Sequence, residues 1–180
     1  MNLKKHSAII SLMVVIFLVT SAVLPTAFAA EDAEKQWFRL GTTNYQITIP
    51  SDFTEGELTE NEIKEEAIVR MRNSDEILEF NVYQFSKEGY PEDLAAYAEA
   101  EAASYGATDI VTDGEINGIP VASYRCKFSV EGVEYDVLVY ILDAGEDYAE
   151  VSFLLLTGGT SYRAALRTIE TLERTEARAE

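Results

Sequence analysis

The sequence is poor in the residues from which disulfide-bonded domains and most enzyme sites are built. Its 180 residues include one cysteine, one histidine and one tryptophan. A single cysteine excludes a disulfide within the chain, so a hydrophobic core must hold the fold together. The histidine, His6, lies in the first thirty residues. If those residues are removed, the commonest general base and most zinc sites are excluded as well.

Basic residues are also scarce. The chain has 14 lysines and arginines against 32 aspartates and glutamates, a net charge of −18. A charge of this sign repels nucleic acid and anionic membrane surfaces. We therefore expect neither as a partner, whereas basic partners and cations remain compatible with the composition.

The first thirty residues have the pattern of a signal peptide. Lys4 and Lys5 precede an apolar run at 9–19, and the small-x-small pattern at 27–29 is typical of a cleavage site. The alternative is a retained anchor, but the run is short and interrupted against the about 20 residues of a bilayer span. Removing both lysines leaves 12 of the 14 basic residues against all 32 acidic ones, a net charge of −20. No cysteine near the site offers a lipid attachment point, so we expect a secreted or extracytoplasmic protein.

The remaining length suits one domain. We expect a signal peptide at 1–30, a single domain at 31–173 and a frayed, charged tail at 174–180. Alternation of apolar and polar residues predicts a series of strands. They lie at 37–40, 45–49, 67–72, 77–85, 110–116, 121–130, 133–143 and 148–156. Short turns such as Asn117-Gly118 favour antiparallel pairing over parallel strands joined by helices.

Two helices are predicted. The first opens at Pro91 and ends at Gly106, with an apolar face that contains one polar residue, Glu101. The second runs over about 161–172, with Thr160 or Ser161 as its cap. The fold class is α+β: one antiparallel sheet of about 6–7 strands covered by helices.

Three places in this order resemble the Mog1/PsbP-like fold family, including its secreted bacterial members. The strand at 45–50 is followed by Ser51-Asp52-Phe53, an Asn-Gly hairpin lies at 116–122, and a strand pair with a closing helix spans 133–172. The resemblance covers nearly the whole of 31–173 and implies an α+β fold that binds other proteins. It implies no catalytic residues, cofactor or metal ligands.

Three segments are candidate binding sites. The acid-rich stretch at 55–66 suggests a weak calcium site or a docking surface, but its loose spacing favours a solvated face. The segment 143–147 lacks the glycine and distal glutamate of a calcium loop, and a polar turn explains it better. The segment 157–161 lacks the lysine of a phosphate-binding loop, and chain reversal with helix capping explains it.

Cys126 and the tyrosines have two interpretations each. Alternation along 121–130 places Cys126 on an apolar strand face, as a small core residue and not a reactive thiol. Most tyrosines are expected to pack with the hydroxyl at the surface, and exposed ones would form a recognition patch. The seven in predicted elements are Tyr83, Tyr97, Tyr105, Tyr124, Tyr135, Tyr140 and Tyr148.

These features favour a secreted, non-catalytic binding or accessory domain that recognises a protein or an envelope component. The alternative is an exported protein that binds a cation or small molecule through 55–66. An enzyme that uses paired carboxylates is a third and weaker hypothesis, because 32 acids produce such pairs by chance. We predict no catalytic, cofactor-binding or metal-binding residue.

Overall fold

The computed structural model describes residues 35–58, 60–64, 66–72, 78–130, 132–157 and 161–175. The expected signal peptide, the turn at 73–75 and the glycines at 158–159 lie outside these residues. Among the described residues, no helix is long and apolar enough to cross a membrane.

Ten strands and three helices make up the described chain. The strands are β1 (Lys35–Arg39), β2 (Tyr45–Pro50), β3 (Thr54–Gly56), β4 (Ala67–Arg72), β5 (Leu78–Ser86), β6 (Thr108–Ile116), β7 (Ile119–Val130), β8 (Val133–Asp143), β9 (Asp147–Leu156) and β10 (Glu173–Arg174). The helices are α1 (Glu60–Lys64), α2 (Leu94–Ser104) and α3 (Ser161–Ile169).

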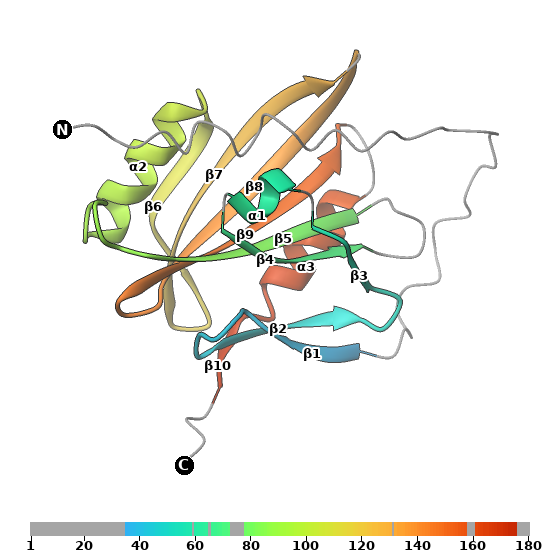
Figure 1. Ribbon diagram of the computed structural model, residues 1–180, viewed down its shortest axis with the longest axis horizontal. Helices are drawn as coiled ribbons and strands as arrows, with labels where there is room; N and C mark the ends of the chain where they lie inside the picture. Colours follow the sequence, from blue (N-terminus) through green and yellow to red (C-terminus); the bar gives the residue numbers. More distant parts are fainter. Residues whose placement is uncertain are drawn as a thin grey trace.

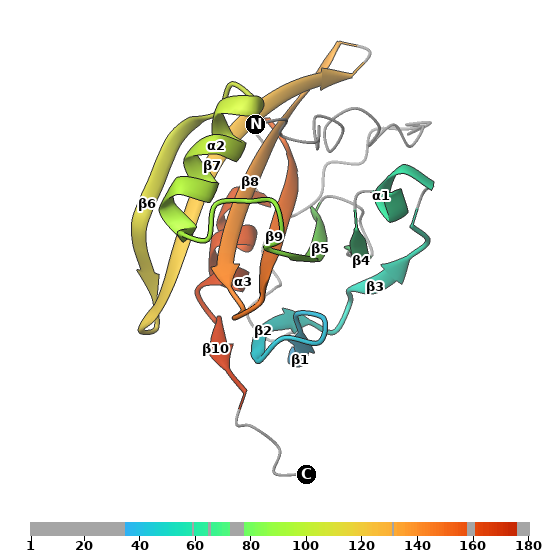
Figure 2. The same ribbon diagram turned by 60° about the vertical axis from the view of Figure 1, so that its left-hand side comes forward.

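The strands form two antiparallel sheets. The large sheet has seven strands in the order β3-β4-β5-β9-β8-β7-β6, and the small sheet has three in the order β1-β2-β10. Figure 1 shows the small sheet below the large one, with α3 beside it, and Figure 2 shows α2 on the near side of β7 and β8. α2 and α3 therefore cover opposite faces of the large sheet.

Each face of the large sheet has its own core. On the face under α3 and the small sheet, side chains from every second residue of β9 meet β2 and α3. Its fully buried members include Ile47, Phe80, Val151, Phe153 and Ile169. On the opposite face, α2 covers a second cluster that includes Ala122, Tyr124, Cys126 and Ile141. Strand alternation explains the division, because successive side chains point to opposite faces.

The α+β class and most strands agree with expectation, but five details differ. The strands at 35–39 and 45–50 form a separate sheet with β10 instead of extending the large one. β3 is not predicted by the sequence. Strand pairing also extends one residue beyond the expected domain boundary at 173, since Arg174 pairs with Tyr45. α2 begins at Leu94 and not at Pro91, because the Asp93 side chain caps it by accepting from the Ala96 N–H at 2.9 Å. α3 ends at Ile169, so Leu172 is buried from the segment that follows the helix.

Candidate functional site

A hollow of about 740 Å³ lies where the two sheets meet, and we call it the turn groove. It is lined by residues of the β1–β2 turn, the β8–β9 turn, the start of β7 and the short strand β10. Its lining residues are Thr42, Thr43, Asn44, Tyr45, Gln84, Pro120, Asp143, Ala144, Gly145, Glu146, Asp147 and Arg174. Segments more than a hundred residues apart thus meet at one place.

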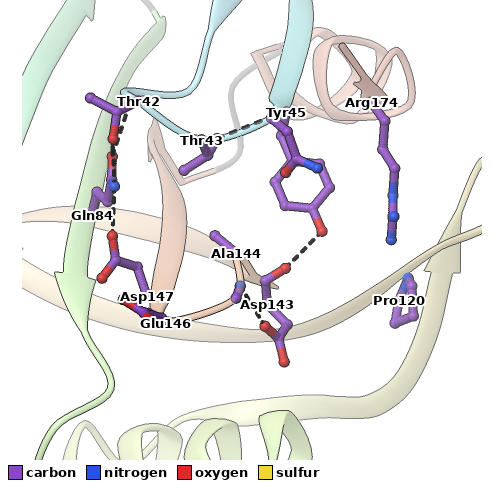
Figure 3. A pocket seen from close by; sticks show the side chains of 12 residues that line it. Thr42, Thr43, Tyr45, Gln84, Pro120, Asp143, Ala144, Glu146, Asp147 and Arg174 are labelled. Atoms are coloured by element: carbon purple, nitrogen blue, oxygen red, sulfur yellow. Dashed lines mark hydrogen bonds between the residues drawn. The ribbon is translucent and has the colours of Figure 1, made fainter. Parts of the chain in front are cut away.

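One wall of the turn groove is held by Gln84. Its amide oxygen accepts from the backbone N–H and the hydroxyl of Thr42, both at 3.0 Å, and its amide nitrogen donates to Asp147 at 2.7 Å. Figure 3 shows these three side chains in one column. The Gln84 side chain therefore joins the β1–β2 turn to the β8–β9 turn.

The floor of the turn groove is fixed by Tyr45 and Asp143. The Tyr45 hydroxyl donates to the backbone carbonyl of Asp143 at 2.7 Å. The Asp143 carboxylate lies 2.7 Å from the Lys87 ammonium and accepts from the Gly145 N–H at 2.9 Å. Burial acts to raise the pKa of Asp143, but these two partners outweigh it and hold that pKa below its ordinary value. Asp143 is therefore a fixed negative charge.

Arg174 stands on the opposite side of the turn groove from Gln84 and Asp147 (Figure 3). Its guanidinium lies 5.8 Å from the centre of the Tyr45 ring. The strand that carries it is anchored on both sides, since Glu173 pairs with Gln46 and the Thr175 N–H donates to the Asn44 carbonyl at 2.8 Å. The groove thus has carboxylates on one side and a guanidinium on the other, both on ordered backbone.

The acidic segment at 55–66 is only partly the solvated face that we expected. Glu55, Glu57, Glu60 and Glu66 are exposed, but Glu62 is buried. Its carboxylate accepts two hydrogen bonds from Nη1 of Arg70, at 3.0 and 2.9 Å. The prediction is wrong at Glu62 because β4 places a buried guanidinium beneath α1. Across the described part of the chain, no group of three acidic or sulfur side chains is arranged to hold a metal ion.

The seven tyrosines of the predicted elements pack in the protein, and none of the seven is exposed as the alternative recognition patch would require. Tyr83, Tyr97, Tyr124 and Tyr148 are buried, and the other three tyrosines of that set are half-buried. The Tyr148 hydroxyl donates to the Pro91 carbonyl at 2.6 Å, and its ring stacks on Tyr97 at 4.4 Å. The expectation that most tyrosines pack is correct, but their hydroxyls find partners inside the protein. Tyrosine content alone does not distinguish the two arrangements.

Cys126 is the small core residue that the alternation predicts. It is buried among the side chains beneath α2, while Arg125 and Lys127 pair with Asp136 away from that cluster. Burial raises the pKa of its thiol to about 11, so almost none is thiolate at neutral pH.

The turn groove is not predicted by the sequence. The sequence predicts a polar turn at 143–147, but nothing in that segment indicates that it faces the β1–β2 turn. Gln84 gives no signal either, because the same strand also carries the polar residues Glu79, Asn81 and Ser86.

No sequence profile of a known protein family matches this chain, and no curated protein sequence matches it. Solved structures do. One is cyanobacterial PsbP (CyanoP) from Synechocystis, with 9% identity and a TM-score of 0.57 over 84% of this chain and 98% of that one. Another is a protein from Bacteroides thetaiotaomicron, with 22% identity and a TM-score of 0.54 over 76% of this chain. This chain spans 47% of the Bacteroides protein's length. These likenesses show the fold, which is Mog1/PsbP-like, as the sequence resemblance implied.

Proposed function

We propose that this protein is an exported, non-catalytic binding or accessory domain that recognises another protein or an envelope component through the turn groove. The observation that carries the proposal is the hydrogen-bonded lining of this hollow. Side-chain hydrogen bonds of 2.7 Å from Gln84 and Tyr45 tie its two main turns together before any partner is present. A preformed surface loses less conformational entropy on binding than a loose one does.

The chemistry of the groove favours binding over catalysis. General acid–base work needs a carboxyl or imidazole group whose pKa lies near the working pH, within reach of the substrate. Asp143 has a lowered pKa and an ion-pair partner. Burial raises the pKa of the Glu79 and Glu101 carboxyls, and neither residue lines the groove.

The partner should present both charges and hydrogen-bonding groups. The carboxylates of Asp143, Glu146 and Asp147 line the groove and suit a basic group of the partner. Arg174 also lines it and suits an acidic or carbonyl group of the partner. The fold is consistent with this role, since the resemblance implies proteins that bind other proteins. Cation binding by 55–66 has less support, because the Glu62 carboxylate is already bound to Arg70.

Capture with charge-reversed variants tests the proposal. Glu146 lines the groove and is exposed, so Glu146→Lys changes the groove surface without disturbing the core. Glu115 on β6 is also exposed and lies outside the groove, so Glu115→Lys is a matched control for net charge. We expect the wild type and Glu115→Lys to capture the same partner from the cell envelope and Glu146→Lys to lose it. Equal capture by all three proteins, or no partner for any of them, would contradict the proposal.

A further inference from the structure

β1 is the longest sheet edge in the described part of the chain that pairs without a register break. The two sheets end at β1, β10, β3 and β6. β10 has two residues and β3 has three, and the pairing of β6 with β7 is irregular at two places. β1 has five residues in continuous register with β2, at the lower border of the small sheet in Figure 1. Short or irregular edges are poor templates for another strand, whereas β1 is a good one.

Only alternate residues of β1 use their backbone groups to bind β2. In an antiparallel pair, every second residue exchanges hydrogen bonds with the residue opposite. The Leu40 N–H donates to the Tyr45 carbonyl at 3.0 Å, which fixes the phase of this alternation. Phe38 and Gln36 are therefore the residues of β1 whose backbone groups bind β2.

The residues between them direct their backbone groups to the open edge. Opposite Trp37 in β2, the Thr48 N–H donates to the Thr171 hydroxyl at 2.7 Å and so points away from β1. Lys35 and Trp37 thus present both an N–H and a carbonyl group at the edge, and Arg39 presents its N–H. An added strand would find these groups in the same alternation that joins β1 to β2.

The side chains of the same three residues are exposed. The Phe38 ring packs against Phe80, with the ring centres 5.7 Å apart, and so faces the core. Because successive side chains of a strand point to opposite faces, Lys35, Trp37 and Arg39 lie together on the outer face. Trp37 is 58% exposed. β1 therefore presents an indole ring between two cations, on the residues whose backbone faces the open edge.

The edge is positively charged on a chain whose net charge is −18. Among the described residues, neither Lys35 nor Arg39 belongs to an ion pair. Arg39 instead donates to the Thr43 carbonyl at 2.7 Å. The strands of the small sheet hold one acid, Glu173 on β10, and its carboxylate accepts from the Gln46 amide at 2.6 Å. Both cations of β1 are therefore available to carboxylates of a partner.

These charges decide which strand can be added. If β1 paired antiparallel with β1 of a second copy about Trp37, Lys35 would lie opposite Arg39. Like charges directly opposite each other destabilise a strand pair, whereas opposite charges and aromatic pairs stabilise it. The edge therefore disfavours a second copy of itself and suits a strand with two acids on either side of an aromatic residue.

We propose that β1 accepts an extended acidic segment of a partner protein as an added antiparallel strand. The segment has the pattern acid-x-aromatic-x-acid. Its carboxylates lie opposite Lys35 and Arg39, its aromatic ring lies opposite Trp37, and main-chain hydrogen bonds to the open edge hold it in place. No residue of β1 lines the turn groove, so this is a second surface, separate from the one proposed above.

Trp37 is the one tryptophan of the chain, so its fluorescence reports on β1 directly. The probe is an end-blocked peptide that contains Glu-Thr-Tyr-Thr-Glu, titrated into the wild-type protein at low salt. We expect the emission to move to shorter wavelength and acrylamide quenching to fall as the peptide covers the indole ring. A peptide that does not bind would overturn the proposal.

Amide hydrogen exchange distinguishes an added strand from contact with the side chains alone. With the peptide bound, the Trp37 amide should become protected, because its N–H then has a partner. The Phe38 amide, already bonded to Ile47 of β2, should change little. A change in fluorescence without protection of the Trp37 amide, as stacking of a sugar ring on the indole would give, would overturn the proposal.

Two methylated peptides test the main-chain hydrogen bonds. A methyl group on the backbone nitrogen of the central tyrosine removes the donor to the Trp37 carbonyl, so binding should be lost. Methyl groups on the nitrogens of the two threonines, which point away from β1 in the antiparallel arrangement, should leave binding intact. Equal binding of the two methylated peptides would overturn the proposal.

Three variants locate the binding surface. Lys35→Glu replaces an attractive pair with a repulsive one and should weaken binding of the peptide by about tenfold. Lys64→Glu makes the same change of charge at an exposed position of α1 and should bind like the wild type. Equal affinity of these two variants would overturn the proposal. Glu146→Lys alters only the turn groove and should also bind like the wild type, so failure at one surface is distinguishable from failure at the other.

Discussion

Nη1 of Arg70 lies 2.9 and 3.0 Å from the two carboxylate oxygens of Glu62, and both side chains are almost fully buried. This contact fixes α1, a helix of five residues, to β4. So short a helix is not stable by itself. The ion pair therefore explains how a strongly acidic segment becomes ordered, and the Glu79 carboxylate, 3.6 Å from Nε of Arg70, completes the arrangement.

Loss of Glu62 should destabilise the protein strongly. Glu62→Ala leaves the Arg70 guanidinium buried with only Glu79 beside it, and removing one partner of a buried pair costs about 3–5 kcal/mol. We expect the lower end of this range in urea unfolding, because Glu79 remains. Glu60→Ala, which removes an exposed acid from the same helix, should change the free energy of unfolding by less than about 0.5 kcal/mol. Similar losses in both variants would mean that the pair is not what holds α1.

Asn117 should be essential to the β6–β7 turn for two separable reasons. Its backbone φ is 50°, in the left-handed region, and its amide nitrogen donates to the carbonyls of Glu170 and Leu172, both at 2.9 Å. Asn117→Gly keeps the backbone conformation and loses the two hydrogen bonds, at a cost of about 1–2 kcal/mol. Asn117→Ala loses the two hydrogen bonds and also strains the left-handed backbone, so it should cost about 1 kcal/mol more than Asn117→Gly. Equal melting temperatures for the two variants would show that backbone strain contributes nothing here.

Cys126 should react slowly with thiol reagents in the folded protein. Its thiol is buried and has a pKa of about 11. Labelling at pH 8 should therefore follow unfolding, with complete reaction only in denaturant. In a Cys126→Ser background, Ser129→Cys puts a thiol on the exposed side of the same strand and should label at once. Rapid labelling of native Cys126 would contradict the described packing of β7 under α2.

The Lys87–Asp143 pair should contribute a small stability that disappears in acid. The pKa of Asp143 is lowered from 3.8, so the contribution is present above pH 3.8 and is lost as pH falls through the lowered value. Because the Asp143 side chain is 47% exposed, Lys87→Met should cost less than about 1 kcal/mol at pH 7. The difference between the wild type and this variant should shrink below pH 3.8 and with added salt. A difference that grows in acid would contradict the assignment.

Local pattern was sufficient for most of the fold. Strand alternation correctly predicts β4 at 67–72 and β8 at 133–143, and it places Cys126 on the buried face of β7. The positive φ values of Asn117 and Gly118 agree with the hairpin predicted there. These features depend on neighbours in the chain, which is why they can be read from the sequence.

The missed features depend on contacts between distant residues. β10 has two residues and exists because Glu173 pairs with Gln46, which no local pattern indicates. The burial of Glu62 depends on the guanidinium of Arg70 in β4, and the acidic pattern of 55–66 gives no sign of that partner. The turn groove also depends on distant residues, since its walls come from opposite ends of the domain.

In-cell crosslinking tests the central claim, recognition through the turn groove, most directly. A photoreactive amino acid placed at Glu146, in the groove, and in a second protein at Glu115, on the exposed β6, samples two acidic positions on the same fold. The account predicts a discrete adduct with an envelope component from position 146 and none from position 115. Adducts of equal yield from both positions, or no adduct from position 146, would contradict it.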